Sequence, residues 1–338
     1  NSIRSVHRVL REAIRSAGVS SLSVVIPVFR GEQTLPELHR QLMGALGALA
    51  PAFEIIYVED SGGDGSWSLI AAFARADSRV RGIRMNRNFG QHNAILCGIR
   101  AAKHDLIVTM DDDLQHPVEE IPKLLAALTE EVDVVYGFPE RERHSVMRRL
   151  ASQLTKLALA SAMGAETARH VSAFRLFRTQ LREGFRDYRS PSVSIDVLLT
   201  WATTRFATVR VAHRPRAAGV SGYTLGALMR HGINLMTGFS TIPLQVASFI
   251  GFGFVLVGFA TMGYVFVNYF LHGSAVPGFA FLASIVTLFS GAQLFALGIF
   301  GEYLARMHFR SMDRPAYVIR EVAEADLERS PMRTGVRA

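Results

Sequence analysis

The longest uncharged stretch of the chain constrains its fold more than any other feature. No Asp, Glu, Lys or Arg occurs between His231 and Gly301. Within it, two apolar segments, Leu244 to Leu271 and Phe279 to Leu304, are each longer than the ~20 residues that a helix needs to cross a bilayer. We therefore expect two transmembrane helices over residues 244–304. The alternative is a helical hairpin buried in a large soluble core, which two such lengths in succession disfavour.

The charges that flank these segments predict their orientation. Arg230 precedes the first segment, the link from His272 to Gly278 carries no charge, and four arginines follow the second segment, namely Arg306, Arg310, Arg314 and Arg320. Because arginine and lysine accumulate on the cytoplasmic side of membrane proteins, both termini and the preceding domain are predicted to be cytoplasmic, at the inner (cytoplasmic) membrane.

Three further segments flank the soluble domain and the two predicted transmembrane helices. Residues 1–20 combine four arginines with apolar residues, and predict an amphipathic helix that contacts lipid, a partner subunit or its own domain. Apolar residues recur at helical spacing over residues 223–243, which indicates either a helix in the membrane interface or a linker helix packed on the soluble domain. Residues 305–338 are predicted to form a basic cytoplasmic tail.

The composition supports one soluble domain, residues 21–222, in addition to the hairpin. The chain has 338 residues and a net charge of +8, from 37 Lys and Arg against 29 Asp and Glu. The arginines are scattered and no nucleic-acid-binding signature accompanies them, so we expect anionic lipid and phosphate-bearing substrates as partners, and no nucleic acid. The single cysteine, Cys97, excludes an intrachain disulfide and is predicted to be a buried small hydrophobic residue.

Short β-rich apolar runs alternate with helical patterns from Leu22 onward. Strands are expected at residues 22–28, 53–58, 80–85, 106–110 and 132–136, and helices at 35–49, 66–76, 92–102 and 118–128. This rhythm predicts an α/β fold with an open, mostly parallel sheet and helices on both faces. Ligands bind such sheets at the carboxyl ends of the strands. Three loops are predicted to meet at that edge, namely Pro27–Glu32, Glu59–Ser66 and Asp111–Pro117.

The loop with three consecutive carboxylates predicts a metal site. Asp111, Asp112 and Asp113 repel one another unless a cation compensates them. Oxygen ligands suit Mg²⁺ or Mn²⁺, commonly as one or two carboxylates completed by substrate phosphates. On an extended strand Asp111 and Asp113 would project together, and Gln115 continues their parity as a third ligand or an orienting residue. The alternative is an acidic helix start, with Asp capping the helix after Pro117.

These loops and strands resemble a known family, the inverting family-2 glycosyltransferases of the GT-A fold. Within it they are similar to polyprenyl-phosphate sugar transferases: dolichol-phosphate mannose synthases, GtrB-type glucosyltransferases and the undecaprenyl-phosphate formamido-arabinose transferase. The resemblance covers roughly Ser23 to Val322. Its motifs are Val24-Val-Ile-Pro-Val28, Asn86-Arg-Asn-Phe-Gly-Gln-His92, Asp111-Asp-Asp-Leu-Gln-His-Pro117, Phe174-Arg-Leu176, Gly219-Val-Ser-Gly-Tyr223 and Gly301-Glu-Tyr-Leu304.

The resemblance implies roles for individual residues. Nucleotide-sugar binding is implied for Pro27, Phe29, Glu32, Asp60, Arg87, Asp111 and Asp112. Asp111 and Asp113 are implied to be catalytic, and with Gln115 to hold the metal and the diphosphate. Binding of the acceptor and diphosphate phosphates is implied for Arg175, Arg216, Ser221 and Tyr223, together with Arg141 or its neighbour Arg143. Arginine suits this task because its planar guanidinium pairs with two oxygens at once.

The chain departs from the family pattern at three places. A Tyr-Asn-Glu after the first strand is here Phe29-Arg30-Gly31, with Glu32 as the nearest acid. The usual Gly-Asp-Phe-Arg is Ser172-Ala-Phe-Arg175, and the usual Ser-Lys-Tyr is Ser221-Gly-Tyr223. One acid and one lysine are therefore missing near the phosphates, and Arg214 or Lys156 is a candidate substitute for the lysine.

The resemblance implies transfer of a sugar, with inversion, from a nucleotide diphosphate sugar to polyprenyl (undecaprenyl or decaprenyl) phosphate at the cytoplasmic membrane face. It further implies Mg²⁺ or Mn²⁺, a UDP-sugar donor and a homo-oligomer, a tetramer in relatives. Two alternatives stay open. A processive polysaccharide synthase would need more spans and a Gln-x-x-Arg-Trp motif, which Leu199-Thr-Trp-Ala-Thr203 does not match. A non-catalytic, membrane-anchored scaffold that binds nucleotide sugars would tolerate the missing acid and lysine.

Overall fold

The structure is a computed structural model that describes residues 21–139, 170–191, 193–214, 242–272 and 278–325. The chain divides into two compact units. The first comprises Asn1–Leu225 together with Arg314–Ala338, and the second comprises Gly226–Asp313. The predicted N-terminal amphipathic helix and nearly all of the predicted interfacial helix lie outside the described residues.

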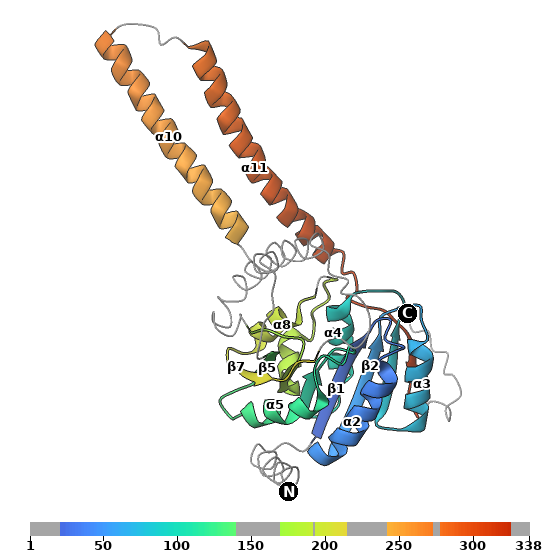
Figure 1. The fold of residues 1–338 in the computed structure, drawn as a ribbon. Helices are drawn as coiled ribbons and strands as arrows, with labels where there is room; N and C mark the ends of the chain where they lie inside the picture. Colours follow the sequence, from blue (N-terminus) through green and yellow to red (C-terminus); the bar gives the residue numbers. More distant parts are fainter. Residues whose placement is uncertain (1–20, 140–169, 192, 215–241, 273–277, 326–338) are drawn as a thin grey trace. The chain divides into compact units, whose positions relative to one another are not determined.

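The first unit is built on one mixed sheet of eight strands in the order β7-β5-β6-β4-β1-β2-β3-β8 (Figure 1). The strands are β1 (Ser21–Val28), β2 (Ala52–Glu59), β3 (Val80–Met85), β4 (Leu106–Thr109), β5 (Val134–Pro139), β6 (Arg175–Arg178), β7 (Phe206–Val211) and β8 (Ile319–Ala323). β1 pairs in parallel with β2 and β4, and β2 pairs in parallel with β3. β6 runs antiparallel to both β4 and β5, whereas β5 and β7 are parallel. The predicted α/β sheet is thus confirmed, with antiparallel strands added.

Helices cover both faces of this sheet. They are α2 (Leu35–Leu49), α3 (Ser66–Ala76), α4 (Gln91–Ala101), α5 (Ile121–Ala127) and α8 (Ile195–Ala202), with 3-10 helices η1 (Val118–Glu120) and η2 (Thr179–Phe185). α2 shows why they form: its buried residues Leu35, Leu38, Leu42, Leu46 and Leu49 recur every three or four positions and make one apolar stripe. α2, α3 and α5 contribute to one hydrophobic core, and α4 and α8 contribute to a second core on the other face.

The burial of β1 explains where polar side chains can gather. All eight residues of β1 are buried, as expected for a central strand covered on both faces. Polar residues that can meet a ligand therefore gather where β1 and its neighbours end. Because β2, β1 and β4 are adjacent and parallel, the loops that follow them meet at one edge of the sheet.

The C-terminal part differs from the predicted basic tail. The second long helix continues to Ser311, beyond the expected end at residue 304, and Ile319–Ala323 then form β8. β8 pairs antiparallel with β3 at the edge of the sheet. The segment after the hairpin is thus part of the first unit.

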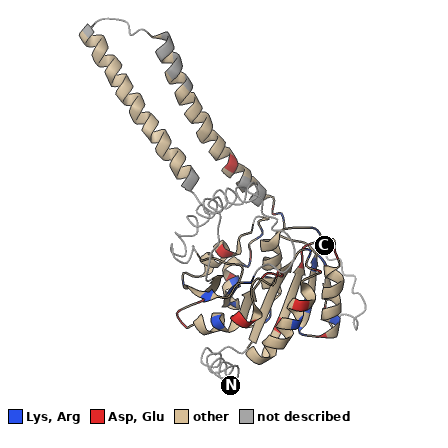
Figure 2. Ribbon diagram, in the orientation of Figure 1, with Lys and Arg blue, Asp and Glu red and all other residues tan. Residues whose placement is uncertain are grey.

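The second unit contains two long apolar helices, α10 (Ile242–His272) and α11 (Phe279–Ser311). Segments of sufficient length and apolarity to cross a membrane are Leu244–Leu271, with a mean hydropathy of 2.0, and Leu288–Ala305, with 1.3. Figure 2 draws both helices almost entirely without charged residues. Large side chains such as Phe249 and Phe270 are 75% and 79% exposed, a surface that lipid would cover and water would not favour.

Candidate active site

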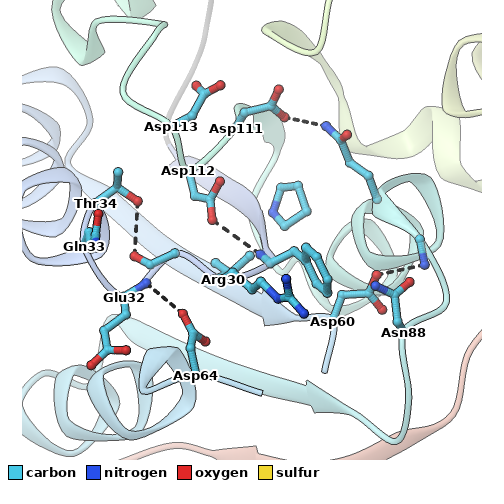
Figure 3. Close-up of a pocket in the computed structure, with 16 residues that line it drawn as sticks. Arg30, Glu32, Gln33, Thr34, Asp60, Asp64, Asn88, Asp111, Asp112 and Asp113 are labelled. Atoms are coloured by element: carbon cyan, nitrogen blue, oxygen red, sulfur yellow. Dashed lines mark hydrogen bonds between the residues drawn. The ribbon is translucent and has the colours of Figure 1, made fainter. Parts of the chain in front are cut away.

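A cavity of about 760 Å³ opens at the carboxyl ends of β1, β2 and β4 (Figure 3). The predicted residues Pro27, Phe29, Glu32, Asp60, Asp111, Asp112 and Asp113 all line it, with Val28, Arg30, Gly31, Gln33, Thr34, Asp64, Asn88, Gly90 and Gln91. The three loops that the sequence brings to one edge therefore form one pocket.

Hydrogen bonds join the loop after β1 to the loop after β2. The Gly31 amide donates to the Ser66 hydroxyl (3.0 Å), and the Glu32 amide donates to an Asp64 carboxylate oxygen (3.2 Å). In return, the Gly65 amide donates to Glu32 Oε2 (3.0 Å). The carboxylate of Glu32 is thus engaged with the neighbouring loop, and it shapes the wall of the pocket through that contact.

Asp60 connects β2 to the loop before α4. Its carboxylate is 3% exposed and accepts hydrogen bonds from the backbone amides of Phe89 (2.7 Å) and Gly90 (2.8 Å). Burial raises the pKa of Asp60, and the two amide donors act in the opposite direction. Gly90 has a φ of 98°, a backbone conformation that favours glycine and that aims its amide at the carboxylate.

The three consecutive aspartates lie in a loop, because β4 ends at Thr109 and Leu114 has a φ of 60°. The premise of an extended strand through Asp113 was therefore wrong. Asp111 Oδ1 accepts a hydrogen bond from Gln91 Nε2 (2.6 Å), and Asp113 Oδ1 accepts one from the Gln115 amide (3.1 Å). Asp112 instead points toward the Phe29 amide, 3.4 Å away (Figure 3). The alternative helix-cap role is also wrong, because η1 has no side-chain cap.

The electrostatics of this loop favour a cation. Burial, with Asp111 as the next contribution, raises the pKa of Asp112 to about 7. In the described part of the chain, no group of three or more His, Cys, Asp or Glu side chains is arranged to hold a metal ion. Asp111 and Asp113 nevertheless fit the common magnesium arrangement, in which one or two carboxylates are completed by water and substrate phosphates.

Arg175 is not among the residues that line the pocket. Its side chain is 2% exposed, and its Nη1 lies 2.5 Å from Asp196 Oδ1, which also accepts a hydrogen bond from the Tyr136 hydroxyl (3.1 Å). A buried guanidinium requires such a partner, and Asp196 on α8 provides it. Arg175 is thus held inside the first unit, between the sheet and α8.

Two more predicted residues lie outside the pocket lining. Arg87 is placed with its guanidinium carbon 4.2 Å from the centroid of the Phe89 ring. The backbone carbonyl of Gln115 accepts a hydrogen bond from the Arg214 amide (2.9 Å). The side chain of Arg214 is exposed and forms an ion pair with Glu119. Arg141, Arg143, Lys156, Arg216, Ser221 and Tyr223 lie outside the described residues.

Gln91 is the main residue of the pocket to which sequence reasoning assigned no role. It is the first residue of α4, and its carboxamide holds Asp111. The signal was present, because Gln91 lies in the motif from Asn86 to His92 and follows β3 at the same edge of the sheet. Asn88 and Asp64 also line the pocket and were not predicted, because neither is an acid that directly follows a strand.

Comparison with known proteins identifies the family. The model of the family "Glycosyl transferase family 2" matches residues 23–185. An undecaprenyl-phosphate 4-deoxy-4-formamido-L-arabinose transferase from Pseudomonas paraeruginosa is 36% identical over 310 residues, which cover 91% of each chain. The chain belongs to glycosyltransferase family 2. A transferase of the same name from Yersinia pestis is 32% identical over 311 residues, covering 91% of this chain and 95% of the relative.

Solved structures agree with this glycosyltransferase in fold. Glucosyl-3-phosphoglycerate synthase from Mycobacterium tuberculosis, in complex with Mn²⁺, UDP-glucose and phosphoglyceric acid, has a TM-score of 0.51 and 17% sequence identity, and the match covers 68% of this chain and 81% of that one. At this identity the likeness concerns the fold alone. The eight-stranded mixed sheet of this family-2 glycosyltransferase is thus of the GT-A type.

Proposed function

We propose that this glycosyltransferase transfers a sugar from a nucleotide diphosphate donor to polyprenyl phosphate and makes a lipid-linked monosaccharide. The observation that carries the proposal is the 36% identity, along 91% of both chains, to a transferase named for undecaprenyl phosphate. The two apolar helices support it, since an acceptor with a long prenyl chain is embedded in a membrane.

The donor is proposed to occupy the pocket, with UDP as the favoured nucleotide. Phe29 lies in its wall and exposes 47% of its surface, which makes an apolar ring available to stack on a base. Pro27, Asp60 and Asp112 line the same space, and Glu32 supports it through the Gly65 amide. Arg87 is proposed to approach the donor from the loop that Asp60 holds.

Asp111 and Asp113 are proposed to hold Mg²⁺ or Mn²⁺ together with the diphosphate of the donor, and Gln115 to orient Asp113 through its backbone amide. When bound, the ion offsets the negative charge that grows on the departing nucleotide diphosphate. Gln91 keeps Asp111 oriented through the 2.6 Å hydrogen bond. The proposed phosphate contacts are Arg216, Ser221, Tyr223 and one of Arg141 and Arg143. Arg175 is proposed to stabilise the fold around the site through its buried ion pair with Asp196.

The acceptor needs little activation. A phosphate monoester has a second pKa of about 6, so the acceptor is already largely an anionic nucleophile at neutral pH. Asp111 or Asp113 is then needed only to orient the attacking oxygen. Attack on the face opposite the leaving nucleotide inverts the anomeric carbon. The catalytic unit and both termini are proposed to be cytoplasmic, since arginines flank the two apolar helices, and a tetramer is the proposed assembly.

The function is tested with the full-length chain in detergent, supplied with nucleotide sugars, undecaprenyl phosphate and Mg²⁺ or Mn²⁺. We expect a lipid-linked monosaccharide, and we expect Asp113→Asn to lower turnover by roughly 10²–10³-fold, the usual effect of losing one element of charge stabilisation. Asp187→Asn is the matched control, because Asp187 is exposed and does not line the pocket.

Three outcomes would contradict parts of this proposal. Unchanged turnover of Asp113→Asn would contradict the proposal that Asp113 holds the metal ion. Nucleotide-sugar binding without transfer to any prenyl phosphate would favour a non-catalytic scaffold. A ladder of long products on a gel would indicate a processive polysaccharide synthase.

A further inference from the structure

The segment that follows α11 packs into the first unit beside the pocket. Ala316 is 3% exposed, and the carbonyl of Val318 accepts a hydrogen bond from the Asn86 amide (2.9 Å), at the start of the loop that leads to α4. Ile319–Ala323 then pair with β3, and Glu324 forms an ion pair with Arg81. Only the residues between Ser311 and Ala316 separate the end of an apolar helix from this contact.

One buried side chain joins this segment to α4. Asn93 is 5% exposed, and its Nδ2 donates to the carbonyl of Ala316 (2.7 Å) and to the carbonyl of Pro191 (3.0 Å). A carboxamide nitrogen carries two hydrogens, and here each has a carbonyl acceptor. Asn93 therefore ties three segments together: α4, the residues before α8, and the segment after α11.

The first turn of α4, to which Asn93 belongs, and the two residues before it hold two acids of the pocket. The amides of Phe89 and Gly90, immediately before α4, donate to Asp60 at the end of β2. Gln91, two residues before Asn93, donates to Asp111 in the loop after β4. A shift or rotation of this turn would move the donors that orient both carboxylates.

We propose that the segment Ala316–Glu324 is a positioning element of the donor pocket, and that Asn93 is the positioning residue through which it acts. Asn93 does not line the pocket, and its carboxamide donates to the carbonyls of Ala316 and Pro191, so its effect passes through the first turn of α4. The chain leaves the catalytic unit, runs through the apolar hairpin and returns to support the turn that carries Gln91. The inference rests on the proposed function only where it refers to the donor.

The decisive variant is Asn93→Asp in the full-length chain. A carboxylate has the same shape, but it accepts hydrogen bonds and would face two carbonyl oxygens. Asn93→Ser keeps one donor and should lie between the parent and Asn93→Asp. Tyr317→Phe is the matched control: Tyr317 lies in the same segment, but its hydroxyl interacts with Cys97 and Arg100, further along α4.

Two readouts separate this role from general stability. The first is hydrogen exchange of the peptide that spans Asn86 to Asn93, which needs no ligand; we expect about tenfold faster exchange in Asn93→Asp, equivalent to about 1.4 kcal/mol. The second is the affinity for a UDP-sugar with Mn²⁺, measured by thermal shift, which we expect to fall about tenfold while the turnover of saturated enzyme falls less.

Parental exchange and parental affinity in Asn93→Asp would overturn the proposal, and equal effects of Tyr317→Phe would overturn the assignment to Asn93. If Asn93→Asp gives no cooperative melting, the same two measurements on Asn93→Ser decide. If the unaltered chain binds no nucleotide sugar, the proposed function fails, and the exchange measurement alone still decides whether Asn93 positions the turn.

Discussion

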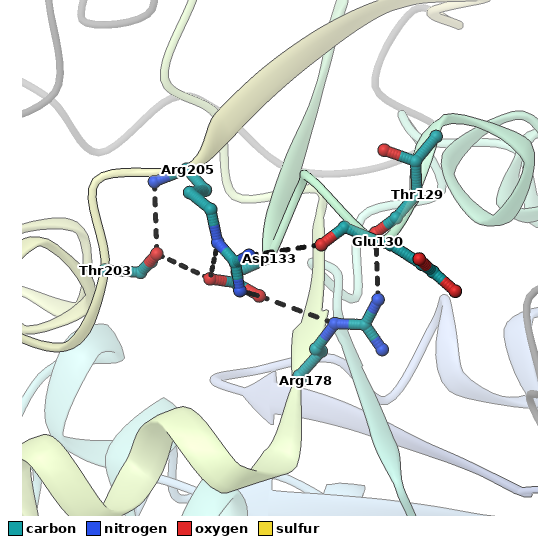
Figure 4. Close-up of polar contacts among 6 residues, drawn as sticks. All are labelled: Thr129, Glu130, Asp133, Arg178, Thr203 and Arg205. Carbon is teal, nitrogen blue, oxygen red and sulfur yellow. Dashed lines mark hydrogen bonds and ion pairs between the residues drawn. The ribbon is translucent and has the colours of Figure 1, made fainter.

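The carboxylate of Asp133 shows how strongly one charged side chain can join elements of this fold (Figure 4). It is 3% exposed and accepts hydrogen bonds from the Thr203 hydroxyl (2.6 Å) and from Arg205 Nε and Nη2 (both 2.8 Å). Arg178 Nε lies 3.5 Å away. These contacts connect the start of β5 with the end of β6 and the loop between α8 and β7.

We predict that Asp133→Asn lowers the free energy of unfolding by about 1.5–3 kcal/mol, the range for hydrogen bonds to a charged group. The neutral amide keeps the shape of the side chain but can accept at only one oxygen. Thermal unfolding measures the effect, at roughly 2–4 °C per kcal/mol for a domain of this size. The exposed Asp187→Asn should leave the melting temperature unchanged, and a similar loss in that control would contradict the prediction.

Comparing the parent chain with Asp133→Asn at different pH values gives a further test, in which the direction of the effect can be predicted. Burial acts to raise the pKa of Asp133, but hydrogen bonds from Arg205 and Thr203 outweigh it, so the pKa falls below its ordinary value of 3.8. The stabilisation is therefore fully present above that value and is lost as the pH falls through the lower pKa of the folded state. The difference in melting temperature between parent and Asp133→Asn should stay constant near neutrality and shrink in acid.

Single residues of the site were predictable to different degrees. Asp60, Asp111 and Asp113 could be placed in the pocket because Asp60 directly follows β2, Asp111 and Asp113 lie in the loop after β4, and the ends of parallel neighbours share an edge. Arg175 could not be placed in the same way. Its burial depends on Asp196, which arrives from a helix that is distant in sequence, and a guanidinium suits a phosphate and a carboxylate equally well.

At the scale of elements, α4 packs so closely on the sheet that one added methyl group should lower the stability of the fold. A Cβ at Gly98 would overlap Val25 Cγ1 on β1 and would lie 3.2 Å from Val58 Cγ2 on β2. Alanine would gain about 1 kcal/mol in helix propensity, but overpacking a tight core typically costs about 1–3 kcal/mol. Val25 is β-branched and fully buried, so its side chain has little room to turn away, and the overlap should prevail.

We therefore predict that Gly98→Ala lowers the melting temperature of the full-length chain. The matched control is Gly44→Ala on α2, where a Cβ meets no atom within 4 Å. That change should raise the free energy of unfolding by up to about 1 kcal/mol through helix propensity. A stabilising effect at both glycines would show that α4 can move away from the sheet.

The sequence predicts the elements that carry long regular patterns. The strands expected at 22–28, 53–58 and 80–85 and the helices expected at 35–49 and 66–76 agree closely with β1 to β3, α2 and α3. β7 was missed, as were β6 and β8. The last two, Arg-Leu-Phe-Arg and Ile-Arg-Glu-Val-Ala, are short and rich in charge, like loops. Their pairing is antiparallel and joins distant parts of the chain, which local periodicity does not report.

At the scale of the whole molecule, one part of the chain suits water and another part suits a lipid bilayer. Charged residues are spread over the first unit and are nearly absent from α10 and α11 (Figure 2). The return of Ala316–Glu324 to the sheet means that the residues on both sides of the hairpin belong to one folded unit. Both ends of the hairpin must therefore lie on the same side of a membrane that it crosses twice.

This requirement leads to a labelling experiment on spheroplasts. In a Cys97→Ser background, which removes the only natural thiol, Gly278→Cys places a thiol just before α11, and Asp187→Cys places one in the catalytic unit. From the arginines that flank the helices we propose that the catalytic unit is cytoplasmic. A membrane-impermeant maleimide should therefore label Gly278→Cys on sealed spheroplasts, but label Asp187→Cys only after permeabilisation. The reverse pattern would invert the orientation, and protection of both thiols until permeabilisation would show that the hairpin does not cross.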